Sequence, residues 1–178
     1  MNETQYISTF KGNRFYPLEG RISEVDIEDI AHGLAFQCRF NGQTSAFYSV
    51  AQHSLMVASL VPRSHYKAAL LHDAAEAYLG DVVKPLKALL GDYGRIEGVV
   101  TKLIANTFEV SFEDYGPIKK ADWVALATEK RDLMPNSTEP WSYLKGVDAV
   151  QEILVPMGPQ EAKSAFLRAW YSTTKAVI

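Results

Sequence analysis

The feature that most constrains this chain is a histidine–aspartate pair inside an apolar stretch. His72 and Asp73 follow the run Ala-Ala-Leu-Leu and precede two alanines, so the helix that carries them should have a buried face. A carboxylate in such surroundings is costly to bury unless a partner offsets its charge. A divalent metal ion would do so, and so would an arginine or an imidazolium. The pair therefore predicts either a metal site or a buried ion pair.

Three further side chains favour the metal. Glu76 lies four residues after His72 and three after Asp73, offsets that place all three on one side of a helix. His53, in Ser-Val-Ala-Gln-His-Ser, and Asp122, in Lys-Lys-Ala-Asp-Trp, add an imidazole and a carboxylate from other predicted helices. We predict one divalent metal site with four ligands, namely His53, His72, Asp73 and Asp122.

This ligand set indicates which ion is bound. Two imidazole nitrogens and two carboxylate oxygens are too rich in nitrogen for a dedicated magnesium or calcium site, and they suit a transition metal. We expect Zn, Co or Mn. The two carboxylates balance the charge of the ion. Coordination positions remain open for water and a phosphate oxygen, as a catalytic site requires. A second divalent ion such as Mg, bridged by Asp73, is a further expectation.

Length and composition restrict the other classes of function. The 178 residues, 47% of them apolar, predict a single domain over residues 1–178 with a substantial core. A net charge of −3 gives no basic field, so we expect no stable nucleic-acid complex. The single cysteine excludes an internal disulfide, and the sequence contains neither a signal peptide nor a long apolar span. We therefore expect a cytoplasmic protein without a membrane partner. We also expect it to form a homo-oligomer.

Helical periodicity accounts for most of the chain after residue 25. The predicted helices cover residues 25–37, 50–60, 64–78, 82–90, 93–108, 117–134, 147–154 and 160–175. Residues 1–24 show no clear period and predict an extended N-terminal arm or a short hairpin between residues 5–10 and 13–16. Nothing after residue 25 predicts a strand. The expected fold class is therefore all-α.

The order His53, then His72-Asp73, then Asp122 resembles the signature of the HD-domain metal-dependent phosphohydrolases. Residues 72–87, His-Asp-Ala-Ala-Glu-Ala-Tyr-Leu-Gly-Asp-Val-Val-Lys-Pro-Leu-Lys, are similar to the same stretch of the small deoxynucleotide 5′-nucleotidases of this superfamily. Arg-Phe-Asn-Gly and Tyr-Ser-Val-Ala-Gln-His-Ser are more similar to phage members, among them dATP triphosphohydrolases. The resemblance covers about residues 37–135 and implies a compact HD-domain helical bundle that acts on a deoxynucleotide, in the host cytoplasm if the protein is phage-encoded.

The resemblance implies catalytic roles for two carboxylates. Glu76 matches the acid/base residue of the nucleotidases and would accept a proton from the water that attacks phosphorus. A positioned acid/base contributes roughly 10²–10⁴-fold to the rate. A surface carboxylate on an exposed helix face is the alternative for Glu76. Asp81 matches a second catalytic position, although an N-cap of the next helix would explain it equally well.

Four residues are candidates for binding substrate. Arg39 offers a planar fork for phosphate oxygens and Lys87 a point charge, and in the relatives the matching residues face the substrate. Lys119 resembles a phosphate-binding lysine of the triphosphohydrolases, with Lys84 and Lys120 as alternatives. Phe40, which follows Arg39 where the nucleotidases usually have tryptophan, would stack on the base or sugar unless it packs into the core.

The expected activity is hydrolysis of dATP to deoxyadenosine and tripolyphosphate, because Arg39, Lys87 and Lys119 together can neutralise a triphosphate. The main alternative is a 5′-nucleotidase that removes phosphate from deoxynucleoside monophosphates of any base. A nucleotide-binding HD protein without turnover is a third possibility, but such a protein has no need of Glu76. A purely structural helical domain would leave Asp73 and Asp122 without partners.

Overall fold

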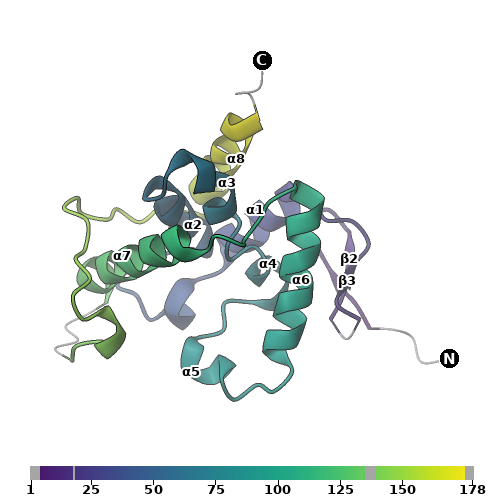
Figure 1. Cartoon of the computed structure of the whole chain (residues 1–178). Coiled ribbons are helices and arrows are strands. Elements are labelled where there is room, and N and C mark those ends of the chain that lie inside the picture. Colours follow the sequence, from purple (N-terminus) through teal and green to yellow (C-terminus); the bar gives the residue numbers. More distant parts are fainter. Residues whose placement is uncertain (1–4, 18, 135–138, 175–178) are drawn as a thin grey trace.

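The computed structural model describes residues 5–17, 19–134 and 139–174, and this part of the chain is mainly helical (Figure 1). Its α-helices, in chain order, are α1 (Ile27–Phe36), α2 (Val50–Ser59), α3 (Tyr66–Leu70), α4 (Glu76–Leu79), α5 (Lys84–Lys87), α6 (Tyr93–Phe108), α7 (Gly116–Leu133) and α8 (Pro159–Thr174). Short 3-10 turns occupy Arg39–Gly42 (η1), Arg63–His65 (η2) and Ser142–Leu144 (η3). None of the described helices combines the length and apolarity that crossing a membrane requires.

The N-terminal arm forms a small antiparallel sheet. Its strands lie side by side in chain order, as β1 (Ile7–Ser8), β2 (Arg14–Tyr16) and β3 (Arg21–Ile22). The first two strands confirm the predicted hairpin, whereas the third was not predicted. Phe15 of the central strand is 1% exposed and packs against Tyr78 of α4, with 5.6 Å between the ring centroids. The sheet thus covers one side of α4, and no other strand occurs among the described residues.

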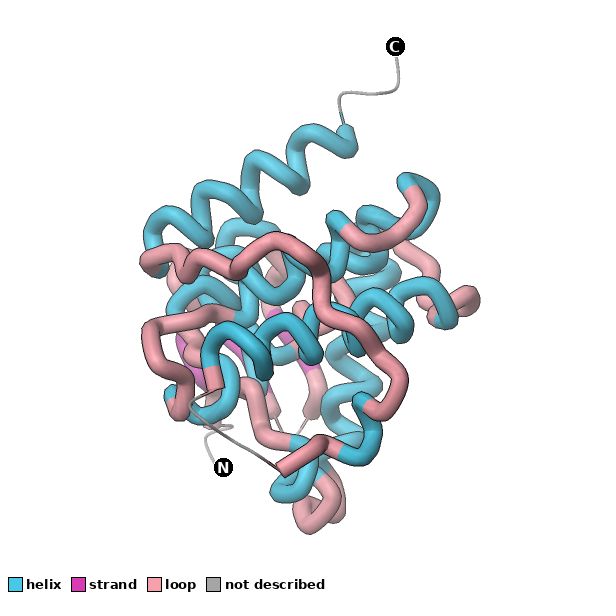
Figure 2. Tube along the Cα trace, turned by 90° about the vertical axis from the view of Figure 1, so that its left-hand side faces the viewer, coloured by secondary structure: helices cyan, strands magenta, loops and turns pink. Residues whose placement is uncertain are grey.

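Helices α1 and α2 form the centre of the core. Helix α1 packs against α2, α4 and α8, and α2 also contacts α3 and α7. The side chains of Ile30, Ala31 and Leu34 are fully buried on α1, as its helical periodicity predicts. Figure 2 shows α8 lying across the top of the other helices, where Phe166 and Trp170 point into the core. Helix α7 lies against α2 on another side, near the turn before α4.

The predicted helix over residues 64–78 is interrupted. Residues 71–75 form turns between α3 and α4, and most of their backbone hydrogen bonds join residues three apart. The cause is local, because Nδ1 of His72 donates to the carbonyl oxygen of Ala69 at 2.7 Å. In an α-helix that carbonyl would accept the N–H of Asp73. The prediction that His72, Asp73 and Glu76 share one face of a continuous helix is therefore wrong, and a turn brings them together instead.

The predicted helix over residues 147–154 is also wrong, because this segment is irregular. Several of its backbone groups bond to side chains of α7. The N–H of Val150 donates to Thr128, and the N–H of Leu154 donates to Asp132. Arg131 donates to the carbonyl oxygens of Val150 and Glu152. The other predicted helices are present, although that at residues 82–90 is shortened to α5 and residue 175 lies outside the described residues.

Substitution of Gly33 by alanine should destabilise the protein by about 1–3 kcal/mol, the usual cost of overpacking. A Cβ at Gly33 would lie 2.8 Å from the carbonyl oxygen and 3.0 Å from the Cα of Ala77, so α1 and α4 would have to separate. Gly98→Ala in α6 is the matched control, because its Cβ would meet nothing within 4 Å. We expect this control to be neutral or up to about 1 kcal/mol stabilising. Equal effects of the two variants in urea denaturation would contradict the packing described here.

Candidate metal centre

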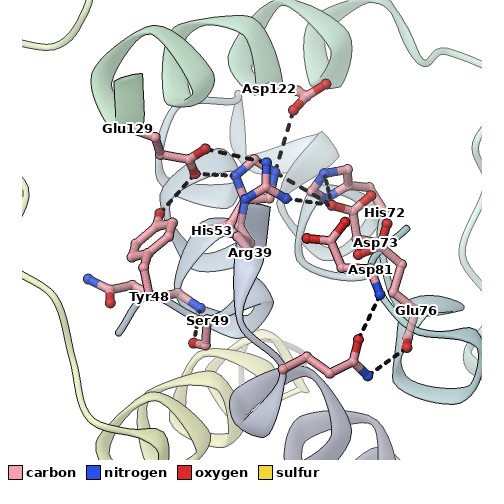
Figure 3. Close-up of polar contacts among 12 residues, drawn as sticks. Arg39, Tyr48, Ser49, His53, His72, Asp73, Glu76, Asp81, Asp122 and Glu129 are labelled. Carbon is pink, nitrogen blue, oxygen red and sulfur yellow. Dashed lines mark hydrogen bonds and ion pairs between the residues drawn. The ribbon is translucent and has the colours of Figure 1, made fainter. Parts of the chain in front are cut away.

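The structure brings the four predicted ligands together from α2, the turn before α4, and α7 (Figure 3). Nε2 of His53 lies 3.4 Å from Oδ1 of Asp122 and 3.5 Å from Oδ2 of Asp73. Nε2 of His72 lies 3.2 Å from the same Asp73 oxygen. Potential ligand atoms of His53, His72 and Asp122 all lie within 4.8 Å of one another. Small side-chain movements would bring them to the distances of about 2.0–2.2 Å that zinc requires.

The two imidazoles fit the role of ligands. Nε2 of His53 and Nε2 of His72 are buried, and neither has a hydrogen-bond partner. The opposite nitrogen of each ring is occupied. In His72, Nδ1 bonds a backbone carbonyl, which only accepts, so Nδ1 carries the proton and Nε2 of the neutral ring has a free electron pair. Metal-binding histidines have this arrangement, with the second nitrogen held by a carbonyl or carboxylate.

Glu129 is a functional candidate that the sequence analysis missed. Its side chain is 0% exposed, and Oε1 accepts from Nδ1 of His53 at 2.6 Å and from the hydroxyl of Tyr48 at 3.0 Å. Its other oxygen accepts from NH2 of Arg39 at 3.3 Å. Burial raises the pKa of Glu129, but the Arg39 and His53 charges outweigh burial, so the pKa is lowered and the carboxylate stays charged. A seven-residue spacing from Asp122, two turns of one helix, was the available signal.

The centre has an excess of carboxylates. Burial and the Arg39 charge lower the pKa of His53, but Glu129 and Asp122 outweigh them and raise it to about 9. Burial raises the pKa of Asp122, yet His53 holds it well below its usual range. Burial also raises the pKa of Asp73, but His72 and His53 outweigh burial, so this pKa is lowered and the carboxylate stays charged. A proton on His53 thus offsets part of the negative charge, and a divalent cation would take over this role when the proton leaves.

Glu76 begins α4 beside this cluster and is 7% exposed. The alternative of a surface carboxylate is therefore wrong. Its Oε2 has no hydrogen-bond partner, and Nζ of Lys87 lies 3.9 Å from Oε1. Burial and the charges of Asp73 and Asp81 raise the pKa of Glu76 to about 9. A cation bound by the cluster would lower this pKa toward the range in which a carboxyl group exchanges protons near neutral pH.

Asp81 also faces the site. The N-cap position of α5 is Val83, which makes no side-chain cap, so the alternative of Asp81 as an N-cap is wrong. Burial raises the pKa of Asp81, although Arg39 opposes the shift. The side chain of Gln37 ties Asp81 to Glu76, because it accepts from the N–H of Asp81 and donates to the carbonyl oxygen of Glu76. The two predicted catalytic carboxylates are therefore held on the same side of the cluster.

The predicted substrate residues line one cavity of about 440 Å³, together with Asp73, Glu76, Asp81 and Asp122. Arg39 is nearly buried, with NH1 3.7 Å from Asp73 and NH2 3.3 Å from Glu129, so carboxylates already hold both arms of its fork. Nζ of Lys119 lies 3.0 Å from Oδ2 of Asp122, and Nζ of Lys87 lies 2.6 Å from Oε1 of Glu97. Phe40 is half-buried at the cavity and does not belong to the core.

A second cavity, of about 870 Å³, adjoins the cluster on the side of α6. It shares Asp73, Glu76 and Lys87 with the first cavity and also includes His72. Lys102 and Tyr115 contribute polar groups to its wall. The candidate metal centre therefore lies where two cavities meet, with space for a ligand that extends to either side.

Replacement of His72 by alanine should abolish tight binding of a divalent transition metal, because it removes one of the two imidazole nitrogens that face the cluster. Elemental analysis of the purified variant after exposure to Co²⁺, Mn²⁺ and Zn²⁺ measures this directly. His65→Ala is the matched control, since His65 bonds Ser64 and Asp114 away from the cluster. Full metal content in the His72 variant would show that the site is assigned wrongly.

Glu129→Gln should weaken metal binding by about 10–100-fold, the usual effect of removing the partner that orients a histidine ligand. Glutamine keeps the size of the side chain but cannot supply the charge that faces His53 and Arg39. Asp132→Asn, three residues later in the chain, is the control because its carboxylate pairs with Arg131 instead. Competition with a metal-binding dye measures both affinities. Unchanged affinity in the Glu129 variant would mean that His53 is not a ligand.

Comparisons with known proteins give relatives but no established activity. The uncharacterized protein YfdR of Escherichia coli K12 is 39% identical over 163 residues, which cover 91% of this chain and 92% of YfdR. An uncharacterized protein of Rhodobacter capsulatus is 42% identical over 120 residues, or 62% of this chain and 61% of that protein. No family model matches the sequence. The identity and coverage of the first match place this chain in the same family as YfdR.

Proposed function

We propose that this protein is a metal-dependent phosphohydrolase of the HD-domain type that acts on deoxynucleotides. The observation that carries the proposal is the meeting of two unpartnered imidazole nitrogens with two carboxylates at the wall of an open cavity. In an ion pair alone, the buried Nε2 atoms would face carboxylate oxygens at 3.2–3.5 Å without forming a hydrogen bond. A transition metal accounts for both.

The residues of the cavity divide the chemistry between them. His53, His72, Asp73 and Asp122 would hold a Zn, Co or Mn ion, and Asp73 would also bridge to a second ion such as Mg. When bound, the metal would polarise a phosphate oxygen and acidify a water molecule. Glu76, buried beside the cluster, would accept the proton of the attacking water. Lys87, 3.9 Å from Glu76, would hold a phosphate oxygen close to that carboxylate.

The specific activity that we propose is hydrolysis of dATP to deoxyadenosine and tripolyphosphate. The resemblance of residues 39–42 and 48–54 to phage triphosphohydrolases supports this choice. The amino groups of Lys84, Lys87 and Lys119 surround the first cavity, and the second cavity offers space for a phosphate chain beyond the cluster. A triphosphate carries more charge than a single lysine can offset, so this number of cations favours it.

One observation favours a second candidate, a deoxynucleoside 5′-monophosphate phosphatase. Arg39, Lys87 and Lys119 all face carboxylates already, at distances of 2.6–3.7 Å. They would have to leave these partners before they could bind phosphates. A monophosphate needs fewer cations than a triphosphate, so fewer of these ion pairs would have to open.

A substrate panel separates these activities. The purified protein is incubated with Co²⁺, Mn²⁺, Zn²⁺ or Mg²⁺ and each deoxy- and ribonucleoside mono- and triphosphate, and the released phosphate species are identified. We expect tripolyphosphate from dATP, with dGTP and the 2-amino analogue of dATP as poor substrates. Release of orthophosphate from monophosphates of every base would establish the second candidate. No hydrolysis with any metal would contradict both.

Glu76→Gln should lower kcat by about 10²-fold or more while the bound metal is retained, because the amide cannot accept a proton. The binding of substrate should survive, so KM should change less than kcat. Glu161→Gln, an exposed position at the start of α8, is the control. Loss of metal in the Glu76 variant would identify Glu76 as a ligand instead of an acid/base.

A further inference from the structure

We propose that Trp141 and Tyr143, together with Phe40, form the surface on which the base of the nucleotide stacks. This inference rests on the proposed function and adds two residues from the segment after α7. We refer to the three rings as the aromatic wall. All three line the same cavity as Asp73, Asp122 and Lys87.

The rings of the aromatic wall form a continuous series. The centroids of Phe40 and Trp141 are 6.0 Å apart, and those of Trp141 and Tyr143 are 5.9 Å apart. The ring planes of Trp141 and Tyr143 make an angle of 30°, so the two rings are stacked. Tyr143 is 51% exposed, so part of its ring is open to a ligand. Exposed ring faces beside a phosphate-binding site are what a nucleobase needs for stacking.

The backbone at Phe40 adopts an energetically unfavourable conformation. Phe40 has φ 54° and ψ 33°, and Asn41 has φ 52° and ψ 31°, both in the left-handed region. That region is disfavoured for residues other than glycine, most of all for a bulky side chain. Such strain persists only where the surrounding contacts enforce it, and it concentrates at binding sites. Here the N–H of Gln43 donates to the carbonyl oxygen of Phe40 at 3.0 Å, and the guanidinium of the preceding Arg39 is held by Glu129 and Asp73.

Helix α7 fixes both sides of the aromatic wall relative to the metal centre. Glu129 holds Arg39, the neighbour of Phe40. The next residue, Lys130, donates to the carbonyl oxygen of Glu139, and its amino group lies 5.2 Å from the centroid of the Trp141 ring. A nucleotide whose phosphate contacts the cluster would therefore meet the aromatic wall at a fixed separation.

Cations border the aromatic wall as well. The guanidinium of Arg39 lies 5.2 Å from the Phe40 ring, and the amino group of Lys84 lies 5.8 Å from the Tyr143 ring. An apolar partner protein would gain little from cations around its contact surface. A ligand that joins a flat aromatic ring to phosphates fits both groups of residues. The chemistry of the cavity thus favours a nucleotide over a peptide.

The test compares ligands with and without a base. Binding of dATP, dAMP and deoxyribose 5-phosphate is measured by calorimetry with Mn²⁺ present, in protein carrying Glu76→Gln so that hydrolysis is slowed. We expect Trp141→Ala to raise the Kd of dATP or dAMP by about fivefold or more, the range for loss of one stacking partner. The Kd of deoxyribose 5-phosphate should rise by a clearly smaller factor. Trp141→Phe should restore most of the nucleotide affinity.

Two further variants keep the result decisive. Tyr143→Ala should show the same preference for weakening nucleotide binding, even if Trp141→Ala proves unstable. Tyr171→Ala, at an exposed aromatic residue of α8, is the control and should bind every ligand as the parent does. Equal losses for the nucleotide and for the sugar phosphate would overturn the aromatic wall while leaving the proposed function intact. If no phosphate compound binds with any metal, both proposals fail.

Discussion

The buried carboxylate of Glu129 is the interaction on which the site depends. It joins α7 to a part of the chain 76–90 residues earlier, because it bonds His53 of α2, Arg39 of η1 and Tyr48 of the loop between them. A carboxylate with no exposure is stable only while these partners remain, and breaking such a buried pair usually costs about 3–5 kcal/mol. Helix α7 also carries Asp122, so one helix supplies a candidate ligand and the carboxylate that bonds a second candidate ligand, His53.

The turn before α4 is the second element that builds the site. Because His72 bonds the carbonyl of Ala69, the helix stops, and the side chains of His72 and Asp73 turn toward His53. The chain resumes as α4 with Glu76 at its first position, which sets this carboxylate beside the cluster rather than one helical turn above it. Local disruption of the helix thus brings the candidate ligands His72 and Asp73 and the candidate acid/base Glu76 to one cavity.

Much of the fold could be predicted from the sequence, because periodicity reports directly on burial. It predicted α1, α2, α6 and α7, and turn residues predicted the first hairpin. The two errors share a physical cause. In the turn at His72 and in the segment at residues 147–154, side chains bond backbone groups that a helix would otherwise use. Competition of this kind depends on contacts with other parts of the chain, which a local pattern does not contain.

The same distinction applies to the site. Its four candidate ligands were predicted because imidazoles and carboxylates are rare inside apolar stretches, and the cost of burying them is a property of the residues themselves. Glu129 and Trp141 gave no such signal, since a glutamate in an amphipathic helix and a tryptophan in a loop are ordinary. Their proposed roles rest on position alone: Glu129 lies 2.6 Å from His53, and Trp141 belongs to the series of rings that begins at Phe40.

The most direct test of the central claim is a crystal structure of the protein grown with Mn²⁺ or Co²⁺, with anomalous scattering measured at the absorption edge of the metal. The account predicts one strong anomalous peak about 2.0–2.3 Å from Nε2 of both His53 and His72, with carboxylate oxygens of Asp73 and Asp122 completing its protein ligands. Crystals saturated with metal that show no peak there, with the two Nε2 atoms bonded to carboxylates or water, would contradict it.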